Sequence, residues 1–275
     1  MTSMRPAIAF CVAIASLVFG AAAAQSPAVD ADQREIAAPV SRADSAAIET
    51  LSPVPDSAPA FVAPPAPDSR SLDVRAFRFL NGRIANPVFD AIMPVATDLD
   101  RWRVAILLVW AGLVLFGRAK GRWTALMLIP IIAASDQLSS SVIKHLVERM
   151  RPCEVLGGVH LWYGPEGWIT TPAEVVRSYK SSFAFPSSHA ANITASLLFL
   201  GLAYRRLLAP LLAIAALVGF SRIYIGVHWP SDVLAGTAIG AVIACVAYIV
   251  FRRIYPRERE GTAATPRAPD RPLSE

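Results

Sequence analysis

Long apolar runs, separated by short polar turns, occupy most of the chain after residue 100 and leave few choices of fold. In lipid, every backbone N–H and C=O needs a partner within the segment, which favours the α-helix. The predicted membrane-crossing helices lie at about 102–117, 123–147, 189–204, 207–222 and 232–252. Several are short for a full crossing, so tilt or interfacial flanks must supply the remaining length. The composition, 54% apolar and 17% charged, agrees with a membrane protein.

The first 24 residues have the layout of a secretory signal. Arg5 precedes an apolar core, Ala7–Phe19, and Ala22–Ala24 supplies a small-residue cleavage site. Cleavage after Ala24 is the preferred interpretation, and an uncleaved anchor helix is the alternative because the segment approaches the length of a span. The predicted fold class is therefore all-α, a polytopic membrane helical bundle of about five to six transmembrane helices.

Composition divides the rest of the chain. Residues 25–70 are rich in Ala, Pro, Ser and Asp, and they predict a disordered periplasmic linker because few large apolar side chains are available to offset the ordering entropy. Residues 71–255 form the predicted membrane domain. Residues 256–275 carry charges and prolines without apolar periodicity, which predicts a disordered cytoplasmic tail.

Two amphipathic pieces open the membrane domain. Leu72, Phe79 and Leu80 can share one helical face, and a second piece follows Asn86-Pro87. Both are predicted to be N-terminal amphipathic helices lying in the membrane interface. Packing of both helices on the bundle's own surface is an equally weighted alternative.

Arginine and lysine indicate the orientation. Basic residues concentrate in the turn at 117–122, in the turn at 204–207 and in the tail after Phe251. If the spans alternate, all three lie on one side, which the positive-inside rule makes cytoplasmic. The loop at 149–188 and the stretch at 221–232 then face outward. The net charge of +5 therefore marks loops, and nucleic-acid binding is not predicted.

Three polar islands gather on the outward face. They are Lys144 with Arg151-Pro152, the segment Phe185-Pro186-Ser187-Ser188-His189, and Ser221-Arg222 with His228 and Asp232. Lysine as a point charge, arginine as a bidentate fork and amides at a helix start suit a phosphate group. The islands contain no carboxylate cluster for a metal, and the three cysteines lack metal-ligand spacing. The prediction is a phosphate site with no metal and no cofactor.

Two histidines allow one to attack phosphorus and the other to protonate the leaving oxygen. Asp232 follows His228 by four residues, with Pro230-Ser231 as a predicted helix start, so a carboxylate can reach that imidazole. His228 is therefore the candidate nucleophile. His189 follows Ser187, a predicted helix N-cap, and is the candidate acid at the positive end of a helix.

These motifs resemble the type-2 phosphatidic acid phosphatase superfamily of membrane lipid phosphatases. Its signature is Lys-x6-Arg-Pro, Pro-Ser-Gly-His and Ser-Arg-x5-His-x3-Asp. The first and third parts match at Lys144 to Pro152 and at Ser221 to Asp232. The second part reads Pro186-Ser187-Ser188-His189, with serine in place of glycine. Three ordered motifs between Asp136 and Gly240 make the resemblance specific.

The resemblance implies a helical bundle, no metal requirement and a phosphohistidine intermediate on His228, with Asp232 orienting it and His189 as acid. The residues implied to hold the phosphate are Lys144, Arg151, Ser187, Ser188 through its backbone N–H, and Arg222. The implied protein is a lipid phosphatase of a bacterial inner membrane acting at the periplasmic face. Undecaprenyl pyrophosphate is the favoured substrate.

The sequence leaves several alternatives open. Phosphatidylglycerol phosphate, phosphatidic acid and lipid A phosphate are alternative substrates, and a phosphotransferase is the enzymatic alternative. An inactive scaffold or lipid transporter is the non-enzyme alternative. The predicted partners are the bilayer and a lipid phosphate, and nothing in the sequence sets the oligomeric state. Asp136, inside an apolar run, is predicted to serve polar packing within the bundle. Trp162, Tyr163 and Trp168 predict an aromatic belt, or else a wall over the lipid entrance.

Overall fold

The computed structural model describes residues 67–173, 179 and 182–255. The predicted signal segment, the predicted tail and all but the last few residues of the predicted linker lie outside the described residues. The described part of the chain begins shortly before the first amphipathic piece and ends just after the last predicted span.

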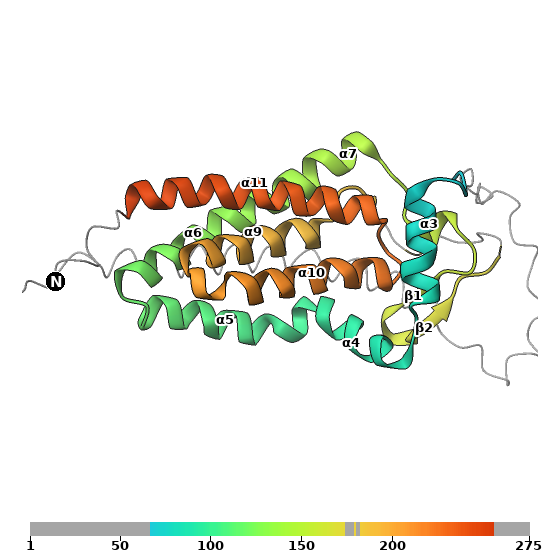
Figure 1. Ribbon diagram of the computed structural model, residues 1–275, viewed down its shortest axis with the longest axis horizontal. Coiled ribbons are helices and arrows are strands. Elements are labelled where there is room, and N and C mark those ends of the chain that lie inside the picture. The colour runs from blue at the N-terminus through green and yellow to red at the C-terminus, as the bar shows by residue number, and fades with distance from the viewer. Residues whose placement is uncertain (1–66, 174–178, 180–181, 256–275) are drawn as a thin grey trace, which may run out of the picture.

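Five long helices lie side by side and form the bundle (Figure 1). They are α5 (Leu99–Leu115), α6 (Arg118–Asp136), α9 (Ser188–Ala203), α10 (Leu208–Tyr224) and α11 (Pro230–Ile254). A π-helical segment, η4 (Gln137–Ile143), and the short α7 (Lys144–Val147) continue α6. A 3-10 turn, η6 (Arg205–Leu207), joins α9 to α10. These helices begin and end within a few residues of the five predicted spans.

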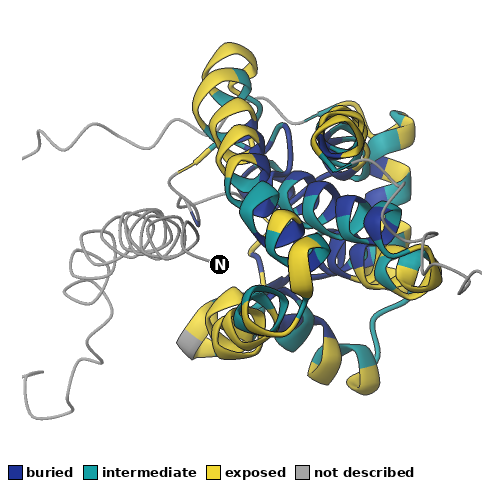
Figure 2. Ribbon diagram, turned by 90° about the vertical axis from the view of Figure 1, so that its left-hand side faces the viewer, coloured by how far each residue is buried: buried dark blue, intermediate teal, exposed yellow. Residues whose placement is uncertain are grey.

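Three helical stretches are long and apolar enough to cross a membrane: Arg118–Val155, Arg205–Tyr224 and Pro230–Ile254. The apolar helix Ser188–Ala203 is shorter. Residues classed as exposed lie mainly on the outside of the bundle, and buried residues lie toward its interior (Figure 2). Many of the exposed ones are large and apolar, among them Leu108, Val242 and Ile249. An outer surface of this kind is suited to lipid contact. The protein is therefore a mostly helical membrane protein.

Helix α9 lies at the centre of the bundle, where it packs against α6, α10 and α11. Its contact with α11 is close, because a Cβ added at Gly236 or Gly240 would overlap the backbone of α9 at the carbonyl oxygen of Ser187 or Ala191. Small residues spaced four apart allow two helix backbones to approach in this way. The contact sets the start of α9 beside the start of α11, where Ser187 N donates to Asp232 O at 3.0 Å.

Shorter elements cover one end of the bundle (Figure 1). They are α3 (Leu72–Arg78), the π-helical η3 (Phe79–Arg83), α4 (Pro87–Thr97), α8 (Pro152–Val155), β1 (His160–Trp162), the 3-10 turn η5 (Gly164–Glu166) and β2 (Trp168–Thr170). The two strands pair antiparallel, with His160 opposite Thr170. This hairpin departs from the all-α prediction. Its strands are only three residues long, and His160 stacks on Trp168 at a centroid distance of 4.1 Å.

The two amphipathic helices pack on the covered end of the bundle. Helix α3 contacts α11 and buries Val74 and Phe77, while α4 contacts α10 and buries Met93. Leu72 and Val88 on the same helices remain exposed. Surface packing is therefore present, and insertion of the exposed apolar side chains into the membrane interface stays a prediction.

Candidate active site

The three polar islands meet at the covered end of the bundle. Lys144 opens α7, Arg151 precedes α8, and His189 lies in the first turn of α9. Arg222 lies in the last turn of α10. Asp232 lies in the first turn of α11. Because these helix ends all lie at one end of the bundle, segments up to 88 residues apart in sequence contribute to a single site.

The start of α9 has the predicted cap. Ser187 precedes the helix, and its Oγ accepts a hydrogen bond from Ala190 N at 3.4 Å. Ser188, which stands where the family signature has glycine, forms a side-chain hydrogen bond with Ser140 at 2.8 Å. Ser140 Oγ also donates to Asp136 Oδ1 at 3.1 Å, and Asn192 Nδ2 donates to the same oxygen at 3.2 Å. Asp136 thus links η4 to α9, as predicted for a polar packing residue.

His228 lies between two opposite charges. Its Nε2 is 3.3 Å from Arg151 Nη1, and its Nδ1 is 3.6 Å from Asp232 Oδ2. A guanidinium can only donate, so the Nε2 beside Arg151 is the acceptor nitrogen and the proton belongs on Nδ1, facing the carboxylate. The 3.6 Å separation is longer than a hydrogen bond, and Nδ1 has no other partner among the described residues.

Burial and the nearby positive charges of Arg151, Arg222 and Lys144 hold the pKa of His228 well below its usual range. The imidazole is almost completely inaccessible to solvent. The arrangement therefore keeps His228 neutral, which is the state in which its Nε2 lone pair can attack.

Two arginines of the site are fixed in different ways. Arg151 is buried and donates to the Ser182 carbonyl oxygen at 2.7 Å, to Ser182 Oγ at 2.8 Å and to the Val227 carbonyl oxygen at 2.9 Å. Arg222 donates through Nη1 to Thr97 Oγ1 at 2.7 Å. Its Nε is buried and has no partner among the described residues. An unpartnered buried donor of this kind is available to an anionic oxygen.

Asp232 lies closer to two other partners than to His228, the partner predicted from the sequence. Its Oδ2 accepts from Trp229 N at 2.8 Å, which caps α11 at the predicted start, Pro230. Its Oδ1 accepts from Arg149 Nη1 at 2.6 Å. Arg149 also reaches Asp73 on α3. Sequence reasoning missed Arg149, Asp73 and Thr97, since none of them belongs to a motif and only the structure brings them to the site.

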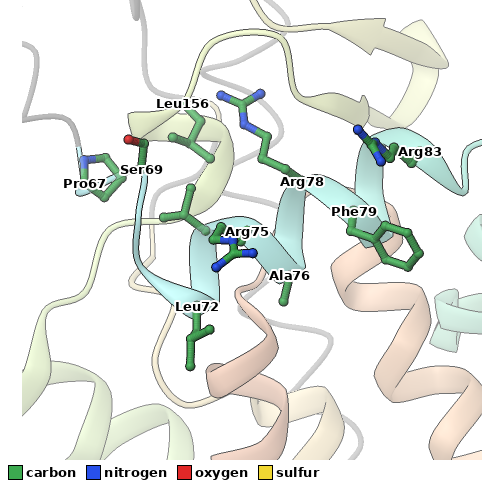
Figure 3. A pocket seen from close by; sticks show the side chains of 10 residues that line it. Pro67, Ser69, Leu72, Arg75, Ala76, Arg78, Phe79, Arg83 and Leu156 are labelled. Carbon is green, nitrogen blue, oxygen red and sulfur yellow. The ribbon is translucent and has the colours of Figure 1, made fainter.

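Two cavities lie near the covered end. The smaller, of about 400 Å³, is lined by Arg222, Thr97, Asp90, Asp98, Arg101 and Trp162 among others. The larger, of about 690 Å³, lies against α3 and η3 and is lined by Arg75, Arg78 and Arg83 with apolar neighbours (Figure 3). Of the residues in the family signature, Arg222 lines the smaller cavity, and the described lining of the larger one includes none. The smaller cavity is therefore the one that adjoins the site.

Potential metal ligands are dispersed in the described part of the chain. No three or more His, Cys, Asp or Glu side chains there are grouped so as to hold a metal ion. The charged groups around His228 are mainly cations, which suit an anionic substrate.

A helical membrane bundle with cations clustered at one end is suited to an anionic substrate, and comparison with known proteins gives the class as a membrane phosphatase. Residues 125–256 match the sequence model described as the PAP2 superfamily. The lipid A 4′-phosphatase of Bacteroides thetaiotaomicron is 28% identical over 199 residues, which cover 70% of this chain and 82% of that protein. Undecaprenyl-diphosphatase BcrC of Bacillus subtilis is 25% identical over 169 residues, covering 61% and 76% respectively.

A solved structure, a transmembrane PAP2-type phosphatidylglycerolphosphate phosphatase from Bacillus subtilis, superposes with a TM-score of 0.49 at 23% identity. The superposition covers 69% of this chain and 91% of that one. Residues 125–256 thus match a PAP2 superfamily domain, as the sequence resemblance indicated, and the phosphatase relatives support a lipid phosphatase that hydrolyses phosphoric esters.

Proposed function

We propose that the protein hydrolyses a lipid phosphate or pyrophosphate through a phosphohistidine on His228, at the periplasmic face of a bacterial inner membrane. The observation that carries this proposal is the position of His228, whose Nε2 lies toward Arg151 and whose Nδ1 lies toward Asp232. A nucleophilic nitrogen beside a cation and an orienting carboxylate on the opposite side of the ring suit attack on a bound phosphate.

In the first step, the phosphate lies among Lys144, Arg151, Arg222, the Ser187 side chain and the backbone amide of Ser188 at the start of α9. His228 Nε2 attacks phosphorus, the N–P bond forms, and the bond from phosphorus to the lipid oxygen breaks. His189 gives its proton to that leaving oxygen. The Asp232 carboxylate stabilises the positive charge that develops on the imidazole.

In the second step, water attacks the phosphohistidine. His189, now neutral, takes a proton from the water while the N–P bond breaks and phosphate forms. The electron pair returns to His228 Nε2, so both histidines recover their starting protonation states. For a pyrophosphate substrate, the leaving group of the first step is the lipid monophosphate.

The proposed orientation rests on where the basic turns lie along the helices. Arg118 to Arg122 open α6, Arg205 and Arg206 follow α9, and Arg252 and Arg253 end α11. In each case the site residue lies at the opposite end of the same helical stretch. The positive-inside rule makes the basic end cytoplasmic, so the site faces the periplasm. With α5 and α9 tilted or extended by interfacial flanks, the bundle has five crossings, or six with an uncleaved amino-terminal anchor.

Undecaprenyl pyrophosphate and lipid A phosphate are the two substrates to test first. The sequence resemblance favours the former. The likeness to a lipid A 4′-phosphatase over 82% of its length favours the latter. The cavity beside Arg222 has room for part of a headgroup, and its carboxylates and Trp162 suit a hydroxyl-bearing one. Phosphatidylglycerol phosphate and phosphatidic acid complete the panel.

The test is phosphate release by purified protein from this panel, with and without a chelator. Wild type should release phosphate from at least one lipid in both conditions. His228→Ala should lose about 10⁴-fold or more of that rate, while His145→Ala, on an exposed histidine that belongs to no motif, should keep it. Near wild-type turnover by His228→Ala would refute the nucleophile, and abolition by chelator would refute the metal-free mechanism.

The same assay separates the alternatives. A phosphotransferase needs an acceptor lipid, so steady release of inorganic phosphate in water argues against it. An inactive scaffold or lipid transporter gives no release from any lipid in the panel. Asp232→Asn should keep the fold and lower turnover by at least about 100-fold, and unchanged turnover would exclude its orienting role.

A further inference from the structure

Arg149 lies between two acids that come from opposite parts of the chain. Its Nη1 donates to Asp232 Oδ1 at 2.6 Å, and its Nη2 donates to Asp73 Oδ2 at 2.5 Å. Its guanidinium also lies over the ring of Trp229, 5.1 Å from the centroid. One planar fork thus joins α3 to the first turn of α11, a geometry that arginine provides and lysine does not.

Asp73 makes further contacts with the start of α11. Its Oδ1 accepts from Ser231 N at 3.0 Å, and its Oδ2 accepts from Ser231 Oγ at 2.5 Å. Ser231 Oγ also accepts from Arg149 Nη1 at 2.6 Å. Burial raises the pKa of Asp73, but the hydrogen bonds from Ser231 and Arg149 outweigh it and leave that pKa below its usual value. Asp73 is therefore a carboxylate that holds both Arg149 and Ser231.

Asp232, which lies next to the reacting histidine, is the most deeply buried of these three side chains. The side chain of Arg149 is 31% exposed, that of Asp73 is 16% exposed, and that of Asp232 is 0% exposed. A fully buried carboxylate stays charged only if a partner compensates for its lost hydration. Arg149 is the only cation that forms an ion pair with Asp232 within the described residues, apart from the contact at 3.6 Å with His228 itself.

The groups around Asp232 come from several neighbouring elements. Arg149 precedes α8, and Asp73 comes from α3. The Trp229 amide and His228 come from the α10–α11 connection, and Ser187 N donates to the backbone oxygen of Asp232. Arg151, beside Nε2, is the cation on the far side of the His228 ring. Arg149 is thus the cation placed to stabilise the charge on Asp232.

We infer that Arg149 and Asp73 are positioning residues, which fix the orientation and the charge of Asp232 and through it the reactivity of His228. This inference rests on the proposed function. Since α3 precedes the 125–256 family match, it also makes an element outside the matched domain part of the active site.

A purely structural role predicts different results from a positioning role. If the contacts of Arg149 and Asp73 only cap α11, their loss lowers the amount of folded protein. The molecules that remain folded then hydrolyse substrate at the normal rate. If it positions Asp232, folded molecules turn over more slowly while KM changes little. The pH dependence also separates the two roles, because Asp232 without Arg149 takes up a proton at a higher pH.

The test uses Arg149→Gln, Arg149→Lys and Asp73→Asn in the full-length protein, with the fastest-hydrolysed lipid of the panel as substrate. Arg149→Gln should lower kcat by about 10- to 100-fold with KM within about threefold, and should move the acidic limb of the pH profile upward. Arg149→Lys should recover part of kcat. Asp73→Asn keeps a hydrogen-bond acceptor, its amide oxygen, and should lower kcat by about three- to tenfold.

The matched control is Arg103→Gln, which removes an arginine from an exposed Arg–Asp pair on α5. It should leave kcat and the pH profile unchanged. The positioning role is refuted if Arg149→Gln turns over within about twofold of wild type per folded molecule, or if its pH profile does not move. His228→Ala is measured in parallel: if it stays active, the proposed function itself fails, whereas an inactive His228→Ala beside an active Arg149→Gln refutes only the positioning role.

Discussion

The two flanks of the site are built differently. On one flank, α9 and α11 touch at the level of their backbones through Gly236 and Gly240. On the other, α4 and the hairpin are held to α10 by side chains: Tyr224 donates to Asp90 at 2.6 Å, and Asn81 bonds both His160 and Tyr224. The candidate nucleophile and its acid lie against the first flank, and the 400 Å³ cavity lies against the second. The backbone contact suits the fixed distances that the proposed chemistry requires, whereas the proposed headgroup side rests on side chains that substitution can change.

The largest expected effect comes from separating α9 and α11. Gly236→Leu places a side chain where even a Cβ overlaps the Ser187 carbonyl oxygen, so the starts of the two helices must move apart. We expect loss of activity and a large loss of folded protein, in the range of several kcal/mol. Detergent-solubilised yield, thermal unfolding and phosphate release measure it.

Gly112→Leu on α5 is the matched control, because no described atom beyond the neighbouring backbone of its own helix lies within 4 Å of a Cβ at that position. It should fold and turn over like wild type. Equal damage from both substitutions would mean that the close helix contact is not what the site depends on.

An intermediate effect is expected from pH, through His228 on the flank formed by α9 and α11. In the folded protein its pKa lies well below 6.5, while in the unfolded chain it is ordinary. Below about pH 6.5, His228 therefore binds a proton in the unfolded state but not in the folded state. The free energy of unfolding then falls by up to about 1.4 kcal/mol per pH unit. Thermal unfolding between about pH 7 and pH 5 measures this slope. His228→Gln should reduce it, and an identical slope in both proteins would contradict the buried neutral state.

The smallest effect is expected on the other flank, where α4 and the hairpin meet α10. Thr97→Val removes the hydroxyl that accepts from Arg222 Nη1, which frees the guanidinium without unfolding the bundle. We expect KM for the lipid phosphate to rise roughly three- to tenfold with kcat less affected. Initial rates over a substrate range measure this. A selective fall in kcat would instead place Thr97 with the reacting groups.

Local signals in the sequence predicted the helices and their caps. Apolar length predicted α6, α10 and α11, and Ser187 and Pro230 lie at the predicted helix starts. The motif spacings indicated that Arg151, His189, Arg222, His228 and Asp232 belong together, and the structure has them at one end of the bundle. The helices and caps depend on neighbouring residues, and the grouping of the site residues depends on three short motifs, each of which can be read from its own stretch of sequence.

Contacts between distant segments could not be predicted in the same way. Asp73 and Arg149 are 76 residues apart, and neither lies in a pattern that points to the other. The hairpin was missed because its three-residue strands are held by tertiary contacts, such as the Asn81 amide on the His160 carbonyl oxygen at 2.7 Å. The four-residue spacing predicts that Asp232 can reach His228, but it gives no information about an arginine from another segment.

The contact between Asp73 and the start of α11 has a consequence for biosynthesis. The site joins one of the first described helices of the chain to the last one, so neither Asp232 nor its partners are in place while the earlier helices enter the membrane. On the proposed mechanism, a nascent chain has no activity until Pro230–Ile254 has been inserted and has met α3. Completion of the enzyme is thereby tied to completion of its topology.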